Sequence, residues 1–120
     1  LSYLHSPGVR VVHRDLSLKN IFIGTAADLP MQVKIGDFGM AFPLPLSQDE
    51  DLRNSFCGTY QFIAPEIYRS DKDGSAYRYG FKNDIWALGV IMYTLLTGSN
   101  PFTCQAESLD HLQRLILNCQ

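Results

Sequence analysis

Residues 83–97, NDIWALGVIMYTLLT, decide the fold of this chain. Asn83 or Asp84 can cap the start of a helix here, and Gly98 can end it, with Pro101 soon after. Apolar side chains cover nearly every face of this predicted helix. Because a helix that is apolar all round is buried on all sides, we expect residues 83–97 to be the spine of a helical core.

Short strands, loops and two further helices are predicted around this spine. Residues 9–12 form a β-branched stretch with Arg10 inside it, residues 21–23 are apolar, and residues 31–35 alternate as a half-buried strand does. A turn over residues 24–30 would join the last two stretches into a hairpin. The other expectations are a final helical turn at 1–5, a long loop at 36–60, a short helix at 64–69, a polar connection at 70–81, and an amphipathic helix from Leu109 to the end with Leu112 and Ile116 on its apolar face.

Composition excludes several classes of protein. A chain of 120 residues is one domain at most, and 46% hydrophobic residues against 18% charged ones argue against disorder. A formal net charge of -2 provides no basic field for nucleic acid. The apolar stretch 85–96 is too short to span a membrane. We therefore expect a globular chain with neither a nucleic-acid partner nor a membrane segment.

The chain ends and the cysteines add two expectations. Residue 1 is Leu, and helical patterns run up to both ends, so we expect a piece of a larger domain that is truncated at both ends. The three cysteines are odd in number and widely spaced, which argues against a disulfide framework or a CxxC metal site. Such usage fits a reducing compartment, the cytoplasm or the nucleus.

Polar residues that suit metal and proton chemistry gather in two loops. The run HRDLSLKN, residues 13–20, places Asp15 and Asn20 five residues apart, and Asp37 follows the predicted strand at 31–35. Carboxylate and amide oxygens are ligands that Mg²⁺ prefers, with water and phosphates completing its shell. A carboxylate left free of metal can accept a proton from an attacking hydroxyl. Alternatively, Asp15 could be a solvated loop residue, Asn20 a turn residue that caps its own backbone, and Asp37 a turn residue before Gly39.

The ordered motifs of the chain resemble those of eukaryotic protein kinases. HRDLSLKN and Asp37-Phe38-Gly39 are followed by Gly58-Thr59, Ala64-Pro65-Glu66 and the helix that begins at Asp84. The resemblance implies an α+β fold in which residues 1–120 form part of the mainly helical C-terminal lobe, with one short β hairpin. It further implies a Mg²⁺-dependent transfer of the γ-phosphate of ATP to Ser or Thr hydroxyls of a protein substrate. The Gly58-Thr59 pair is more similar to Ser/Thr kinases than to Tyr kinases.

The resemblance assigns catalytic and binding roles to five residues. Asp15 corresponds to the catalytic carboxylate that orients the acceptor hydroxyl and takes its proton. Asn20 and Asp37 correspond to the Mg²⁺ ligands beside the ATP phosphates, and Phe22 to the residue beneath the adenine ring. Thr59 corresponds to a residue of the loop that reads the acceptor side chain. For Phe22, a plain role in the core is the alternative.

A regulatory role is implied for Arg14 and Ser55. In the family, an Arg before the catalytic Asp pairs with a phosphate on the activation segment, here residues 37–66. Ser55 lies four residues before Thr59, where that phosphate is often carried. An upstream kinase acting on Ser55 is therefore an expected partner, with Ser47 a weaker candidate and an unmodified Ser55 the alternative. Cys57 is expected to be a small packing residue.

Four further residues are implied to support the site. His13 and Phe38 correspond to members of a stacked apolar column, or are plain core residues. Glu66 corresponds to one half of a buried ion pair whose Arg would lie beyond Gln120. Asp84 corresponds to the residue that binds backbone amides of the catalytic loop, with a simple helix cap as the alternative.

One departure from the family pattern keeps a second function open. Ser/Thr kinases usually carry Lys two residues after the catalytic Asp, and Ser17 occupies that position here. Lys19 cannot take its place by a shift in register, because Asn20 fixes the register. Ser17 favours the alternative of a pseudokinase or scaffold that binds a protein partner. A third hypothesis is that the 120 residues work alone as an interaction module.

Overall fold

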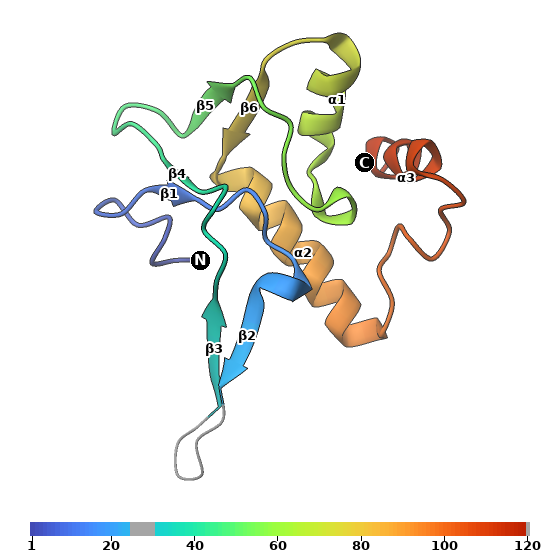
Figure 1. Cartoon of the computed structure of the whole chain (residues 1–120), viewed down its shortest axis with the longest axis horizontal. Helices are drawn as coiled ribbons and strands as arrows, with labels where there is room; N and C mark the ends of the chain where they lie inside the picture. Colours follow the sequence, from blue (N-terminus) through green and yellow to red (C-terminus); the bar gives the residue numbers. More distant parts are fainter. Residues whose placement is uncertain (25–30, 120) are drawn as a thin grey trace.

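The computed structural model describes residues 1–24 and 31–119, which form an α+β structure (Figure 1). The predicted turn at 24–30 lies, apart from Gly24, outside the described residues. The helices are α1 (Pro65–Asp73), α2 (Phe81–Thr97) and α3 (Leu109–Leu117), with short 3-10 turns η1 (Leu18–Asn20) and η2 (Tyr60–Phe62). The strands are β1 (Val11–Val12), β2 (Ile21–Gly24), β3 (Gln32–Ile35), β4 (Phe42–Pro43), β5 (Glu50–Arg53) and β6 (Tyr77–Gly80). They pair antiparallel as β1 with β4, β2 with β3, and β5 with β6, which confirms the α+β class.

The central helix α2 begins and ends as local chemistry requires. It begins at Phe81, two residues before the predicted start, because Gly80 is the N-cap and Asn83, inside the first turn, accepts the Gly80 backbone N–H through its Oδ1 at 2.5 Å. At its other end Gly98 adopts φ 78°, a left-handed conformation that glycine takes without the clash of a Cβ. The predicted helix and its terminating glycine are therefore confirmed. No helix among the described residues is long and apolar enough to cross a membrane.

Only one face of α2 is buried, so the expectation of burial on all sides is wrong for the described residues. That face packs against β6, η2 and β1 and carries Ala87, Val90 and Ile91. No described element covers the opposite face, which leaves Ile85, Met92, Leu95 and Leu96 exposed. The core instead gathers α2, α1, α3, β1 and β4 around one apolar cluster.

Tertiary pairing reshapes two of the predicted loops. The stretch 36–60 contains β4 and β5, and the stretch 70–81 contains the end of α1 and all of β6. These strands form because a distant partner supplies their hydrogen bonds, a contact that local sequence does not signal. Arg10 has φ 49°, so the predicted strand at 9–12 narrows to β1.

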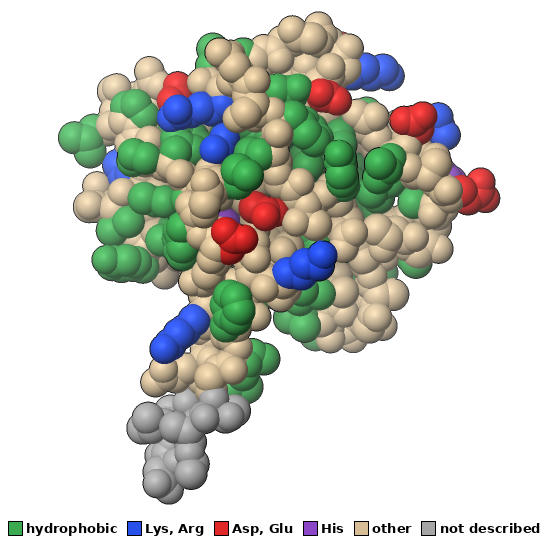
Figure 2. Space-filling model, viewed as in Figure 1, with side chains coloured by type: hydrophobic (Ala, Val, Ile, Leu, Met, Phe, Trp, Pro, Cys, Tyr) green, Lys and Arg blue, Asp and Glu red, His purple; other side chains and the backbone are tan. Residues whose placement is uncertain are grey.

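The β2–β3 hairpin and the two chain ends also depart from expectation. The hairpin pairs in the expected place and projects from the body (Figures 1 and 2), so that Phe22, Ile23, Met31 and Val33 are exposed rather than half-buried. On α3, Leu112 and Ile116 are buried as expected, whereas Leu109 is exposed. This helix ends at Leu117, and residues 2–5 form turns and not a helix.

Asp84 ties α2 to the loop that follows β1. Its carboxylate is 1% exposed and accepts two backbone amides, His13 N–H at 2.9 Å and Arg14 N–H at 3.0 Å. The His5 Nε2 lies 2.8 Å from the same group. Because a buried carboxylate needs such partners, Asp84 fixes the path of the chain as it passes from β1 into the loop at residues 13–20.

Two glycines of α2 should respond oppositely to alanine. Gly98→Ala forces a Cβ into the left-handed region and should lower the free energy of unfolding by about 1 kcal/mol. Gly89→Ala meets open space inside a regular helix and should raise it by about 0.5–1 kcal/mol. Urea denaturation of the full-length protein measures both. Equal effects of the two substitutions would contradict this assignment of the helix end.

Asp84→Ala should destabilise the protein by about 3 kcal/mol, because it leaves two buried backbone N–H groups without their acceptor. The control is Asp110→Ala, which removes an exposed carboxylate of α3 and should cost less than about 1 kcal/mol. Urea denaturation compares the two variants, and equal losses would refute the anchoring role.

Candidate active site

The loop between β1 and η1 orients its histidine through hydrogen bonds at both ring nitrogens. His13 is fully buried, and its Nδ1 accepts the backbone N–H of Asp15 at 3.3 Å. The Nε2 must therefore carry the proton that it donates to the Gly36 carbonyl at 3.0 Å. The ring also meets Phe38 edge-on, with centroids 4.9 Å apart. The structure thus brings His13 and Phe38 into contact, although Phe38 is 45% exposed.

The carboxylate of Asp15 is held by Thr59. Both the backbone N–H and the hydroxyl of Thr59 donate to Asp15 Oδ1, each at 2.7 Å. Gly58 has φ 111°, and a Cβ there would lie 2.9 Å from the Arg14 carbonyl oxygen, so glycine lets this segment approach the loop. Sequence reasoning missed this contact between two residues that it had singled out separately.

The other carboxylate oxygen of Asp15, Oδ2, accepts only one long hydrogen bond among the described contacts. Asn20 donates its Nδ2 to the Asp15 carbonyl at 2.8 Å and only weakly to Asp15 Oδ2, at 3.4 Å. Among the described contacts Oδ2 has no other donor. It therefore keeps the lone pairs needed to accept a hydrogen bond or a proton.

Asn20 and Asp37 suit a hard divalent cation. Because the Asn20 Nδ2 is held by Asp15, its Oδ1 points the other way and accepts no described hydrogen bond. Asp37 is exposed and follows β3 with φ 60°, and its neighbour Gly36 donates its N–H to the Asn20 carbonyl at 2.9 Å. The two side chains thus stem from adjacent backbone segments, and an amide oxygen with a carboxylate is a donor set for Mg²⁺.

Figure 2 shows acidic side chains gathered in the middle of this face, beside the base of the hairpin. Across residues 1–24 and 31–119, no three or more His, Cys, Asp and Glu side chains form a cluster able to hold a metal by themselves. A cation at Asn20 and Asp37 would therefore need further oxygens from water or from a phosphate.

Phe22 provides an apolar surface beside the same loop. Its ring packs so closely on Gly36 that a Cβ there would lie 2.6 Å from Phe22 Cε2. The ring is nevertheless 55% exposed. Glycine at position 36 thus leaves room for the Phe22 ring, which lies exposed to solvent beside the residue before Asp37.

Ser17 and Lys19 differ sharply in exposure. Ser17 is 1% exposed, and its Oγ has no hydrogen-bond partner among the described residues. Lys19 is exposed and takes part in none of the described ion pairs. No ion pair among the described residues joins a lysine or an arginine to Asp15.

The guanidinium of Arg14 packs against two aromatic rings. Its Nε donates to the Met40 carbonyl at 2.5 Å, and its guanidinium lies 5.1 Å from the ring centroids of both Phe42 and Tyr79. The Nη1 is buried without a hydrogen-bond partner among the described residues. Ser55 is exposed, and no described hydrogen bond joins it to Arg14.

Sequence reasoning named several supporting residues but missed their contacts. Glu66 is half-buried and accepts the Asn83 Nδ2 at 2.6 Å, so its carboxylate has a partner inside the chain. Cys57 is also half-buried, and its N–H donates to the Tyr79 hydroxyl at 3.0 Å. Burial raises the pKa of Tyr79, which keeps this hydroxyl protonated. Only proximity in the fold reveals these pairs, since no local motif marks them.

Known proteins match nearly the whole length of the chain. The model of the family described as protein kinase domain matches residues 1–118. The chain is 42% identical over 116 residues to the probable cell cycle serine/threonine-protein kinase CDC5 homolog of Encephalitozoon cuniculi, covering 97% of this chain and 22% of that protein. It is 42% identical over 114 residues to the serine/threonine-protein kinase PLK1 of Xenopus tropicalis (93% and 17%), and 39% identical over 120 residues to the serine/threonine-protein kinase polo of Drosophila melanogaster (100% and 18%).

The chain thus spans less than a quarter of the length of these relatives. The family model matches the loop at residues 13–20, the β2–β3 hairpin and α2. A family match over nearly every residue leads to one conclusion: the chain belongs to the protein kinase domain family.

Proposed function

We propose that residues 1–120 are a partial kinase domain from the C-terminal lobe of a Ser/Thr protein kinase. They would contribute the catalytic loop, the activation segment and the helices that support them. The proposed reaction transfers the γ-phosphate of ATP to Ser or Thr hydroxyls of a protein substrate. The observation that carries it is the Asp15 carboxylate, clamped through Oδ1 by Thr59 and left accepting at Oδ2.

Asp15 is proposed to orient the acceptor hydroxyl and to take its proton. The two 2.7 Å bonds from Thr59 fix the carboxylate plane without using Oδ2. An incoming Ser or Thr hydroxyl could then donate to Oδ2 while its oxygen attacks the phosphorus. Since Thr59 belongs to the segment that would face the substrate, the same contact would couple substrate binding to the catalytic carboxylate.

Asn20 and Asp37 are proposed to hold Mg²⁺ against the phosphates of ATP. When bound, Mg²⁺ supplies positive charge that neutralises the transferring phosphoryl group. The carbonyl and amide of Asn20 are both tied, to Gly36 and to Asp15, so the ligand oxygen is positioned before the cation arrives. The exposed ring of Phe22 is proposed to pack beneath the adenine.

Regulation is proposed to act through Arg14 and Ser55. The unpartnered Nη1 of Arg14 is a donor without an acceptor, and a phosphate on Ser55 would bring acceptor oxygens and negative charge. An upstream kinase would add that phosphate. The three free cysteines, two of them exposed, favour a reducing compartment, so we place the protein in the cytoplasm or the nucleus.

Replacing Asp15 tests the proposed reaction. In the full-length protein that carries this sequence, Asp15→Asn keeps the side-chain size but removes the proton acceptor. We expect phosphoryl transfer to a Ser-containing peptide to fall by a factor of about 10²–10⁴. The control is Asp73→Asn, an equal charge change at an exposed position of α1, which should leave the rate unchanged. Loss of less than a factor of about ten would contradict the role of Asp15.

A pseudokinase that binds a protein partner is the second candidate, and Ser17 is the observation that favours it. The buried Ser17 provides no cation for phosphoryl transfer. A melting experiment on the full-length protein separates the two. A kinase should gain several degrees in Tm at Mg²⁺-ATP about 100-fold above Kd, because the ligand stabilises the native state by about 2.7 kcal/mol. Asp37→Ala should abolish the gain, whereas an unchanged Tm in the native sequence would favour the scaffold.

A further inference from the structure

An acidic run in the activation segment forms ion pairs with three different arginines. Asp49 Oδ1 lies 3.2 Å from Arg10 Nη2, and Glu50 Oε1 lies 2.8 Å from Arg78 Nη1. Asp51 Oδ2 lies 2.9 Å from Arg53 Nη2. Every arginine–carboxylate pair among the described residues involves this run. The partners come from the turn before β1, from β6 and from β5 itself, so the run is attached to separate parts of the fold.

Backbone contacts reinforce the same attachment. Strand β5 pairs with β6 over four residue positions, from Glu50 opposite Gly80 to Arg53 opposite Tyr77 (Figure 1). A Cβ at Gly80 would collide with the Asp49 carbonyl oxygen, so glycine permits the close approach of the two strands. Arg10 Nη2 also donates to the carbonyls of Pro45 at 3.3 Å and Gln48 at 2.5 Å.

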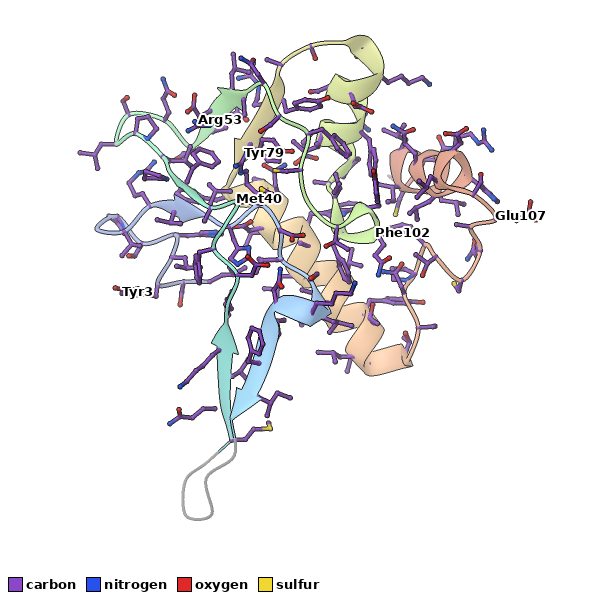
Figure 3. The ribbon with its side chains drawn as sticks, viewed as in Figure 1. Tyr3, Met40, Arg53, Tyr79, Phe102 and Glu107 are labelled. Atoms are coloured by element: carbon purple, nitrogen blue, oxygen red, sulfur yellow. The ribbon has the colours of Figure 1, made fainter. Side chains whose placement is uncertain are left out.

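The arginine expected to bind a regulatory phosphate is not used here. Arg14 contacts Met40, Phe42 and Tyr79, and its Nη1 remains without a described partner. Figure 3 shows Arg53 on β5 and Tyr79 on β6, which mark the two strands that the acidic run joins. The run therefore attaches the segment through arginines other than Arg14.

We propose that residues 49–51 are an electrostatic strap, which holds the activation segment in an ordered position through arginines other than Arg14. A segment that continues to Gly58 and Thr59 is thereby kept near Asp15. The strap consists of contacts between opposite charges at the surface, so it loosens at high ionic strength. This conclusion goes beyond the proposed function and does not depend on phosphoryl transfer.

Charge exchange between Glu50 and Arg78 tests the strap directly. Hydrogen–deuterium exchange of the β5 amides is measured in the full-length protein, in Glu50→Arg, in Arg78→Glu and in the double variant. Each single variant replaces attraction by repulsion and should speed β5 exchange about threefold to tenfold. The double variant restores opposite charges and should return exchange close to that of the native sequence. The amides of the β2–β3 hairpin should not change in any of them.

Two controls separate the strap from a general effect of charge. Asp73→Arg reverses an exposed charge on α1 that forms no described ion pair, and it should leave β5 exchange unaltered. Raising NaCl from 0.1 to about 1 M in the native sequence should speed β5 exchange selectively, because the Debye length falls to about 3 Å. The strap is refuted if single variants exchange as the native protein does, if the double variant is not restored, or if Asp73→Arg has an equal effect.

Discussion

The buried carboxylate of Asp84 is the interaction on which the rest of the structure depends. It joins the first turn of the central helix to the backbone of His13 and Arg14, the two residues that precede Asp15. A charged group that is 1% exposed is tolerable only with such donors, so helix and loop constrain each other. Gly80 and Asn83 fix the residue at which α2 begins. The bonds of Asp84 to the loop backbone therefore make the position of Asp15 depend on the position of the helix.

A chain of polar contacts extends that constraint to the other side of the site. His13 reaches Gly36, which is tied to Asn20, and Thr59 reaches Asp15. Gly36 and Thr59, 23 and 44 residues along the chain from their partners His13 and Asp15, are thus each held to the loop by two hydrogen bonds. Each such bond contributes only about 1 kcal/mol, so the site is ordered by their combination and is open to regulation at its outer segment. The acidic strap acts on that outer segment.

Residue patterns along the chain predict some of this organisation and not the rest. The C-terminal end of α2 followed from Gly98, whose capping chemistry is local, whereas its start was predicted two residues late. The order of the polar motifs indicated the family that the match over residues 1–118 then established. The β5–β6 pairing and the Thr59–Asp15 contact depend on which distant segments meet, and nothing near either residue specifies that. Composition shows what α2 could bury, but not which of its faces the described elements cover.

The most direct test of the central claim is to identify the amino acid that receives phosphate. The full-length protein is incubated with Mg²⁺ and ATP labelled in the γ-phosphate, together with three peptides that differ only in a Ser, Thr or Tyr acceptor. The proposed role of Asp15 beside Thr59 predicts label on the Ser and Thr peptides and none on the Tyr peptide. Label on the Tyr peptide alone, or on none of the three while Mg²⁺-ATP is bound, would contradict it.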